Sequence, residues 1–412
     1  MIEPATWAGV QTLLDDYAGV QADDIIVVLY TSDSYEAAAW VSAALELRGI
    51  PAARVWMAPL YDEGLLARLT SALPPPTEIT GRLLIMTFER DTMSHAGTLA
   101  AALSKYDARR YVVFRAISAG SSLFSNALRV SPNELSSRNT TVLDRCMPAS
   151  RMRITTAAGT DLSLTIDTKR YRWISNRGVA RPGGVVILPA GEVATFPAAI
   201  DGVFVADFAF NINVFTECDS RLRDHPVVVW IEAGRAVKYE CAEPITKKLL
   251  DACFARPHAC NVGELGFGTN VGVGEAVPMN SHINERRPGV HLGFGQHNQL
   301  LEVVSYQCSI HIDLIARGGK VWLDEHPEPL DLESIAPSMC SHPRHLRDED
   351  VFSPESEALE SSDCCGSSTV RESQRLSPPP WRARWKPSTS TFTAASGVRR
   401  KPRRCFPTCR RS

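Results

Sequence analysis

The first 148 residues alternate short apolar runs with longer segments of helical spacing, and this alternation restricts the fold more than any other feature of the chain. Apolar runs rich in β-branched and aromatic residues lie at 24–30, 54–57, 83–88 and 110–114. Residues 34–47 place Ala, Trp and Leu at helical spacing and are followed by Gly49 and Pro51. Strands that alternate with helices predict a parallel sheet covered on both faces, with right-handed crossovers. We therefore expect a doubly wound α/β domain over residues 1–148.

The segment after the first of these runs gives no sign of a nucleotide site. It reads Thr31-Ser32-Asp33-Ser34, without the glycines that let a backbone approach a phosphate. We interpret the domain as an α/β scaffold without a bound nucleotide.

The pattern changes at about residue 149. Residues 152–156 and 161–166 alternate apolar and polar side chains around Ala158-Gly159-Thr160, which predicts a β-hairpin with one solvated face. Further strands are expected at 202–208, 227–232 and 309–315, and one helix at 245–254. These elements predict a β-rich α+β domain over residues 149–330, with the Ser- and Asn-rich stretch 128–145 as the link to the first domain.

Residues 331–412 form a third part with a different composition. From 371 to 412 there are twelve Lys and Arg against one acidic residue, whereas the first 370 residues have 32 against 45. Such a tail cannot bury enough apolar area to fold, so we expect it to be disordered and basic. An alternative is that it is a coding sequence read in a shifted frame. The formal net charge of −2 therefore averages two unlike parts and is no guide to partners.

The composition excludes several protein classes. With 44% apolar and 22% charged residues, the chain is neither collagen-like nor wholly disordered. Its apolar runs are far shorter than the roughly 20 residues needed to span a membrane. Eleven dilute cysteines and an acidic start without a signal peptide favour reduced thiols and a cytoplasmic location. We expect no membrane association, and nucleic-acid binding is not expected either, although a basic tail is the one feature that would favour it.

The most informative motif is an internal echo. Glu264-Leu265-Gly266-Phe267-Gly268 recurs as His291-Leu292-Gly293-Phe294-Gly295, with Glu replaced by His at the first position. Both residue types bind metals, and we expect each to precede a glycine-rich bend that a backbone can approach closely. The alternative is two similar strand-to-turn corners without a function.

Two further segments carry residues of the same kind. In Ser309-Ile310-His311-Ile312-Asp313-Leu314, strand alternation places His311 and Asp313 on one face. Glu192 follows a turn at Pro189-Ala190-Gly191. The whole set, which has three carboxylates and two imidazoles and lacks the thiolates of a structural zinc site, suits one or two divalent cations such as Zn, Co, Mn or Fe. Its members are Glu192, Glu264, His291, His311 and Asp313.

These residues, within Gly191–Val193, Glu264–Asn270, His291–Gly295 and His311–Leu314, resemble the thermophilic metallo-aminopeptidase family (aminopeptidase T, or leucyl aminopeptidase-like). The resemblance implies a metalloprotease-type hydrolase that cleaves an amide at the free amino terminus of a peptide or small amide substrate. It implies that the five residues are ligands of a two-metal centre with one bridging carboxylate, and that the protein is a homodimer. Glu192 and Glu264 would then also be catalytic. Bound metal would polarise the carbonyl and lower the pKa of a bound water.

One position departs from that family. Where the family has a tyrosine, seven residues after the motif histidine, this chain has Asn298. An asparagine amide also donates a hydrogen bond, from a shorter arm, so we take Asn298 as the third catalytic candidate and Tyr306 as a substitute for the missing phenol.

Two alternatives to the hydrolase stay open. The chain also resembles 2,5-dihydroxypyridine 5,6-dioxygenase, a ring-cleaving enzyme with one non-haem iron held by two histidines and an aspartate. His311 and Asp313 match that pattern, while Glu264 stands in place of its other histidine. His291 would be a second histidine for such a triad. The last alternative is a metal-free binding protein that keeps the scaffold. His297 and the segment 280–285 are candidates for the pocket lining.

Overall fold

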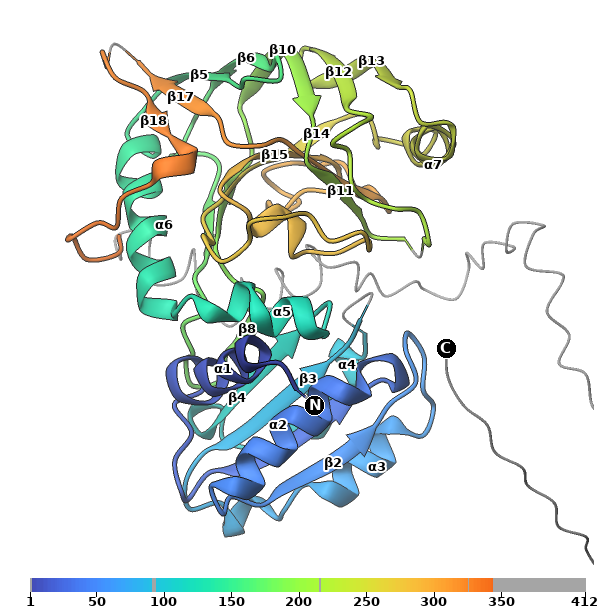
Figure 1. Ribbon diagram of the computed structural model, residues 1–412, viewed down its shortest axis with the longest axis vertical. Helices are drawn as coiled ribbons and strands as arrows, with labels where there is room; N and C mark the ends of the chain where they lie inside the picture. The colour runs from blue at the N-terminus through green and yellow to red at the C-terminus, as the bar shows by residue number, and fades with distance from the viewer. Residues whose placement is uncertain (1, 91–93, 215, 325, 344–412) are drawn as a thin grey trace, which may run out of the picture. The chain divides into compact units, whose positions relative to one another are not determined.

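The computed structural model describes residues 2–90, 94–214, 216–324 and 326–343, all within one compact unit, Met1–Ser368. The basic tail that we expect beyond residue 343 lies outside the described residues. The strands form three sheets, one parallel and two antiparallel, and helices pack around them (Figure 1). The expected mixed α/β fold is thereby confirmed, and the division into domains at residues 148 and 330 stays a prediction.

The parallel sheet has five strands in the order β2-β1-β3-β4-β8. Its strands are β1 (Ile25–Tyr30), β2 (Ala52–Trp56), β3 (Leu83–Phe88), β4 (Tyr111–Ala116) and β8 (Val185–Leu188). All four neighbouring pairs run parallel. The first four strands lie where the apolar runs predict them, and β8 joins them from far along the chain.

Helices cover both faces of the parallel sheet, as predicted. They are α1 (Pro4–Thr12, continued by a π-helical turn, Leu13–Tyr17), α2 (Tyr35–Leu47), α3 (Leu65–Ala72), α4 (Ala96–Leu103) and α5 (Ser121–Ser125). One apolar core joins α1, α2 and α5 to one face of the strands, and a second joins α3 and α4 to the other. The two cores account for the continuous apolar strands, because each strand must bury both of its faces.

Most of the expected link at 128–145 is helical, since Pro132–Cys146 forms helix α6, and its role as a link between domains stays a prediction. Ser131 caps it by accepting a hydrogen bond from the backbone N–H of Glu134, and Pro132 occupies its first turn. Leu135, Val142 and Leu143 are fully buried. The polar residues between them conceal a helical apolar face, which the Ser- and Asn-rich composition does not indicate.

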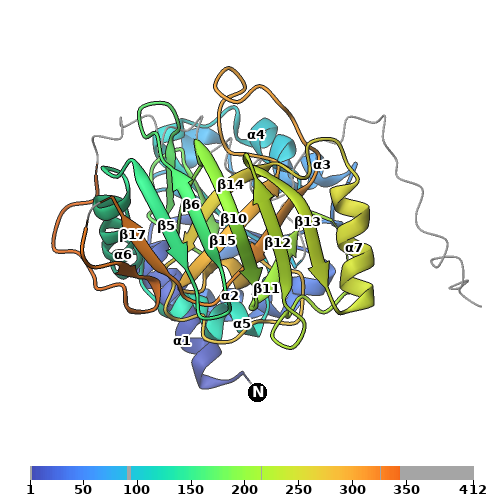
Figure 2. The same cartoon turned by 90° about the horizontal axis from the view of Figure 1, so that it is seen from above.

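The seven-stranded antiparallel sheet has the order β13-β12-β10-β6-β5-β17-β18 (Figure 2). Its strands are β5 (Arg151–Thr155), β6 (Asp161–Thr165), β10 (Ala199–Ala206), β12 (Val227–Glu232), β13 (Arg235–Cys241), β17 (Lys320–Leu323) and β18 (Leu330–Asp331). The predicted hairpin is β5 and β6, and the predicted helix is α7 (Pro244–Phe254). The inner face of the seven-stranded sheet packs on the six-stranded sheet through one large apolar core.

The six-stranded antiparallel sheet has the order β11-β16-β15-β14-β9-β7. Its strands are β7 (Trp173–Asn176), β9 (Glu192–Thr195), β11 (Ala209–Ile212), β14 (Val262–Gly268), β15 (Gly289–Gly295) and β16 (His311–Ile315). Leu265, Leu292 and Leu314 point into the core shared with the seven-stranded sheet. Because strand side chains alternate, the residues on either side of each leucine point to the opposite face.

Three residues connect β8 of the parallel sheet to β9 of the six-stranded sheet. They are Pro189, Ala190 and Gly191, whose φ is +111°. A Cβ on Gly191 would lie 2.6 Å from that of Asn270, so glycine is required there twice over. Among the described residues, no helix is long and apolar enough to cross a membrane, and the cysteines are free thiols.

Candidate metal centre

The five predicted ligands lie on one face of the six-stranded sheet, opposite the apolar core. The strand register pairs every one of them with a glycine on a neighbouring strand. Glu192 pairs with Gly268, Glu264 and Asp313 with Gly293, His291 with Gly266, and His311 with Gly295. Large polar side chains and glycines therefore alternate across the sheet.

The glycines make room for the ligands. A Cβ on Gly266 would lie 2.0 Å from Nε2 of His291, and one on Gly293 would lie 2.9 Å from Cε1 of His311. The expected glycine-rich bends are therefore wrong, because both copies of the echo lie inside strands β14 and β15. The repeat occurs because these neighbouring strands both need a position without a side chain beside a ligand.

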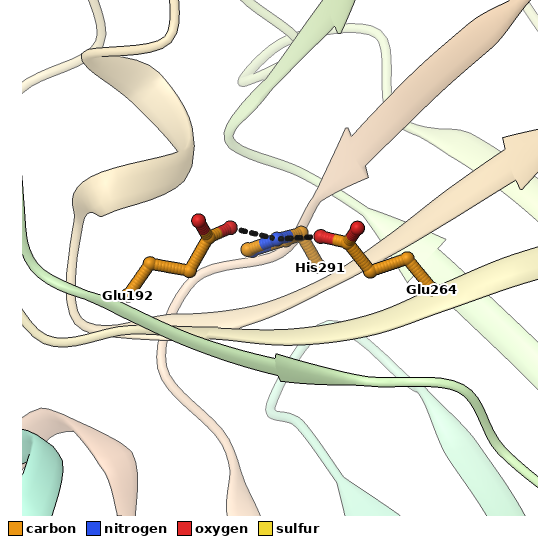
Figure 3. A group of neighbouring side chains, drawn as sticks. All are labelled: Glu192, Glu264 and His291. Atoms are coloured by element: carbon orange, nitrogen blue, oxygen red, sulfur yellow. Dashed lines mark ion pairs between the residues drawn. The ribbon is translucent and has the colours of Figure 1, made fainter. Parts of the chain in front are cut away.

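Glu192, Glu264 and His291 form the first donor group (Figure 3). Nε2 of His291 lies 3.0 Å from Oε1 of Glu192 and 3.5 Å from Oε1 of Glu264. All three residues are buried, and each has a donor atom within 4.8 Å of the other two. Figure 3 shows the imidazole between the two carboxylates.

Glu264, His311 and Asp313 form the second donor group, and they too are buried. Nε2 of His311 lies 3.0 Å from Oδ1 of Asp313. Glu264 belongs to both groups. The arrangement therefore suits two cations that share one carboxylate, or one cation in either group.

Several buried polar atoms in these groups have no hydrogen-bond partner among the described residues. They are both ring nitrogens of His291 and Oδ1 of Asp313. Nε2 of His291 is close to two carboxylates, yet makes no hydrogen bond of acceptable geometry with either. Leaving such atoms buried without a partner is costly, and a cation bound to them would remove that cost. The donor set therefore fits a divalent metal ion.

The electrostatics point the same way. Burial alone lowers the pKa of an imidazole, but the adjacent carboxylates raise the pKa of His291 well above its ordinary value. Burial and the nearby Glu285 raise the pKa of Asp313 to about 7, against the opposing effect of His311. The shift of His291 arises from the buried carboxylates beside it, and that of Asp313 arises first from burial and then from the charge of Glu285. A metal cation would neutralise this negative charge.

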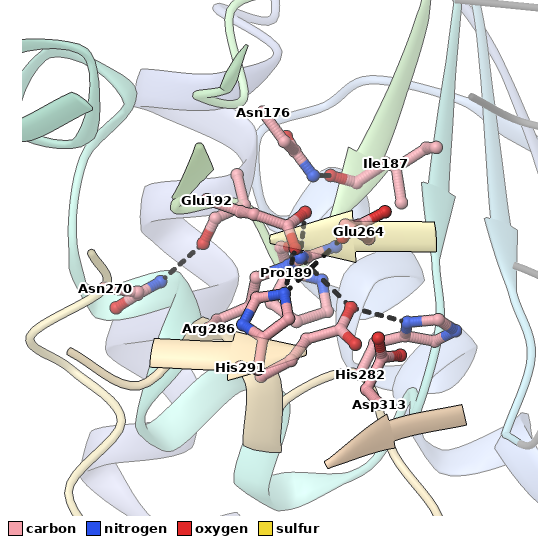
Figure 4. Close-up of polar contacts among 12 residues, drawn as sticks. Asn176, Ile187, Pro189, Glu192, Glu264, Asn270, His282, Arg286, His291 and Asp313 are labelled. Carbon is pink, nitrogen blue, oxygen red and sulfur yellow. Dashed lines mark hydrogen bonds and ion pairs between the residues drawn. The ribbon is translucent and has the colours of Figure 1, made fainter. Parts of the chain in front are cut away.

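A buried arginine is the part of the site that the sequence prediction missed (Figure 4). Nη1 of Arg286 forms an ion pair with Oε2 of Glu192 and lies 3.0 Å from Oε1 of Glu285. Burial would raise the pKa of Glu192, but the charge of Arg286 overcomes this and lowers it. A visible signal was the charged Glu285-Arg286-Arg287 run directly before an apolar strand.

The segment 280–285 lines the centre only in part. His282 and Glu285 belong to it, with Nδ1 of His282 2.8 Å from Oε1 of Glu285. Asn280 instead bonds the backbone of Ile212, and Asn284 bonds the backbone of Val277. Those two residues organise the loop.

Asn298 contacts the shared carboxylate. Its Nδ2 donates to Oε2 of Glu264 at 3.3 Å, while its Oδ1 accepts from Nε2 of Gln299 at 2.7 Å. The second bond fixes which end of the amide faces Glu264. Tyr306 packs its ring against His258 and His297, and His297 bonds the backbone carbonyl of Tyr306. The catalytic role of Asn298 stays a prediction.

Comparisons with known proteins agree with both resemblances expected from the sequence. A family model for 2,5-dihydroxypyridine 5,6-dioxygenase matches residues 114–270, a range that holds Glu192 and Glu264 and ends before the other three ligand candidates. No curated protein sequence matches the chain.

Two solved structures share the fold. The 2,5-dihydroxypyridine dioxygenase from Pseudomonas putida KT2440 has a TM-score of 0.55 at 15% identity, covering 81% of this chain and 97% of that one. Wild-type AmpT from Thermus thermophilus has a TM-score of 0.50 at 11% identity, covering 81% of this chain and 99% of that one. At these identities the two structures show that the fold is shared.

Proposed function

We propose that this chain is a metal-dependent hydrolase that cleaves an amide or peptide bond next to a free amino terminus, as an aminopeptidase does. The observation that carries the proposal is the membership of Glu264 in both donor groups. A carboxylate with donors on either side of it is the arrangement expected of a bridging ligand between two metal ions. Two cations need more donors than one triad supplies, and the two donor groups together offer five ligand residues.

Bound divalent cations would supply Lewis acidity and a water with a pKa near neutrality. The protein residues would hold and orient the reactants. Glu192 and His291 would serve one cation, His311 and Asp313 the other, and Glu264 both. One amide hydrogen of Asn298 is used on Glu264. The role that we propose for the other amide hydrogen is to donate to the oxygen of the substrate carbonyl.

A ring-cleaving dioxygenase with one iron is the second candidate. The family match favours it. The second donor group, Glu264, His311 and Asp313, offers one imidazole and two carboxylates to a single cation, so His291 would have to supply the second histidine of an iron triad. Such a site leaves positions open for a substrate and for dioxygen. A metal-free binding protein is the third reading.

Metal stripping and reloading distinguish these functions. We expect about two Zn, Co or Mn ions per chain, and release of the amine from an aminoacyl anilide but not from its N-acetylated analogue. Glu264→Gln should abolish the release, while Glu302→Gln, a substitution on the exposed side chain of Glu302, should not. One iron per chain, with oxygen uptake on 2,5-dihydroxypyridine and no anilide hydrolysis, would instead establish the dioxygenase. Absence of metal binding would leave the binding protein.

A further inference from the structure

Arg286 is a fully buried cation in the centre that the proposed chemistry does not use. It ends the short 3-10 turn Asn284–Arg286, and 2% of its side chain is exposed. Its Nη1 contacts Glu192 and Glu285, and its Nε donates to the backbone carbonyl of Pro189 at 3.0 Å. The guanidinium is thus anchored to the connection between β8 and β9, directly before the strand that carries Glu192.

The contact with Arg286 divides the two oxygens of Glu192. Oε2 is paired with the guanidinium, and Oε1 lies 3.0 Å from Nε2 of His291. The carboxylate therefore presents one oxygen to the position where a cation would bind. Without the guanidinium, the carboxylate would be free to rotate about its last bond.

The other two carboxylates of the centre are held in the same way. Oε2 of Glu264 accepts from Asn298, and Oε1 faces His291. Oδ2 of Asp313 accepts from Nδ2 of Asn211 at 3.3 Å, and Oδ1 faces His311. In each case one oxygen is bound to an outer donor and the other points to an imidazole.

Glu285 joins two of these outer donors. Its Oε1 contacts Arg286, and its Oε2 accepts from Nδ2 of Asn211 at 3.1 Å. A continuous buried chain of contacts therefore runs from Glu192 through Arg286, Glu285 and Asn211 to Asp313. This chain connects the outermost carboxylate of one donor group to that of the other.

We propose that Arg286 is a positioning residue of the metal centre, which fixes Glu192 as a one-oxygen ligand and, through Glu285 and Asn211, holds the two donor groups in register. The proposal rests on the proposed metal centre and adds a determinant of its affinity. Partners of metal ligands commonly change metal affinity 10- to 100-fold when they are replaced. A guanidinium suits this task because its planar donors engage several acceptors in fixed directions.

A purely structural role for Arg286 makes a different prediction. In that case its charge merely offsets Glu192 and Glu285, and removing one acid together with the arginine should restore normal behaviour. The double variant Glu285→Gln/Arg286→Gln has the same net charge as the wild type and keeps amide groups at both positions. It therefore separates charge balance from orientation.

The test measures Co²⁺ binding by calorimetry and by the visible absorption spectrum of the bound ion. We compare the wild type, Arg286→Gln, the double variant and Arg287→Gln. Arg287 is the matched control, because it contacts the backbone of Gly274 and Pro288 and the surface residue Glu333. Circular dichroism confirms that each variant is folded, and the double variant carries the test if Arg286→Gln alone does not fold.

We expect Co²⁺ affinity to fall about 10- to 100-fold in Arg286→Gln and in the double variant, with an altered Co²⁺ spectrum, and to be unchanged in Arg287→Gln. A double variant with wild-type affinity and spectrum would overturn the proposal while the metal centre stood. Failure of the wild type itself to bind Co²⁺, Zn²⁺, Mn²⁺ or Fe²⁺ would overturn the proposed function, and this inference with it.

Discussion

Two regions of the molecule bury charge, and they do so in opposite ways. On the parallel sheet, Nη2 of Arg115 lies 2.8 Å from Oε1 of Glu89, with 2% and 3% of the two side chains exposed. The other oxygen of Glu89 accepts from the backbone N–H of Ser94 at 2.7 Å. One acid meets one base there, and the remaining oxygen has a partner as well.

The six-stranded sheet contains an uneven set. Glu192, Glu264, Glu285 and Asp313 are all buried around the centre, and Arg286 is the arginine that accompanies them. Imidazoles balance this set only by taking up protons. A buried carboxylate without compensation is expensive, so the comparison separates a pair that the chain completes itself from a set that calls for added cations.

The largest expected effect is the loss of metal binding in His311→Ala. The second donor group loses its imidazole, and we expect tight binding to disappear under both enzyme readings. His225→Ala, a substitution at an exposed histidine, is the control. Metal content by mass spectrometry after gel filtration checks the result, and an unchanged metal content in His311→Ala would refute the site.

Arg115→Met tests the ion pair between Arg115 and Glu89 on the parallel sheet. It leaves Glu89 buried without its cation, and we expect a loss of about 3–5 kcal/mol in the free energy of unfolding. Urea denaturation measures this loss, and metal affinity should be unchanged in the folded variant. Arg115→Met/Glu89→Gln should recover most of the lost stability. If Arg115→Met instead weakened metal binding, the two buried charge sites would not be independent.

Metal removal tests directly whether the buried carboxylates around the centre need a bound cation. A cation at one hundred times its Kd stabilises the folded state by about 2.7 kcal/mol relative to the metal-free protein. Chelation should therefore lower the melting temperature of the wild type and leave that of His311→Ala unaltered, as scanning calorimetry can show. Equal melting temperatures of the wild type with and without chelator would contradict the idea that the set needs a cation.

A pair of glycine substitutions gives the smallest expected effect and compares the same regions. Gly266→Ala places a methyl group 2.0 Å from Nε2 of His291, and we expect about 1–3 kcal/mol of destabilisation together with weaker metal binding. A Cβ on Gly97, in α4, meets nothing within 4 Å, so Gly97→Ala should leave stability equal or higher. Thermal unfolding of both variants measures the difference, which would be absent if His291 simply moved aside.

The sequence predicts these regions unequally, for physical reasons. The first four parallel strands are continuous apolar runs, a pattern that burial on both faces imposes. β8 has only four residues, Val185–Leu188, and it joins a sheet whose other strands end 69 residues or more before it. Nothing local in such a short run marks the sheet to which it belongs.

At the centre, the types of the ligand candidates, the alternation of His311 and Asp313, and the family resemblance together select the five residues that the structure brings together. The glycines between them were misread because a glycine is normally a turn signal, and strand pairing alone reveals that Gly266 and Gly293 accommodate side chains from neighbouring strands. Arg286 was missed because its partners, Glu192 and Glu285, are 94 residues and one residue away in sequence. Only the folded register shows that one guanidinium reaches both.

The short connection from β8 to β9 has a practical consequence for cutting the molecule. A fragment that begins at residue 149 would carry β8 but lack β4, its hydrogen-bonded neighbour in the parallel sheet. Glu192 lies four residues after the end of β8, so the strand that leads to it would have lost its hydrogen-bonded neighbour. We therefore expect that the part of the chain that carries the candidate metal centre does not fold by itself, and that a shortened version of the protein should retain the first four parallel strands.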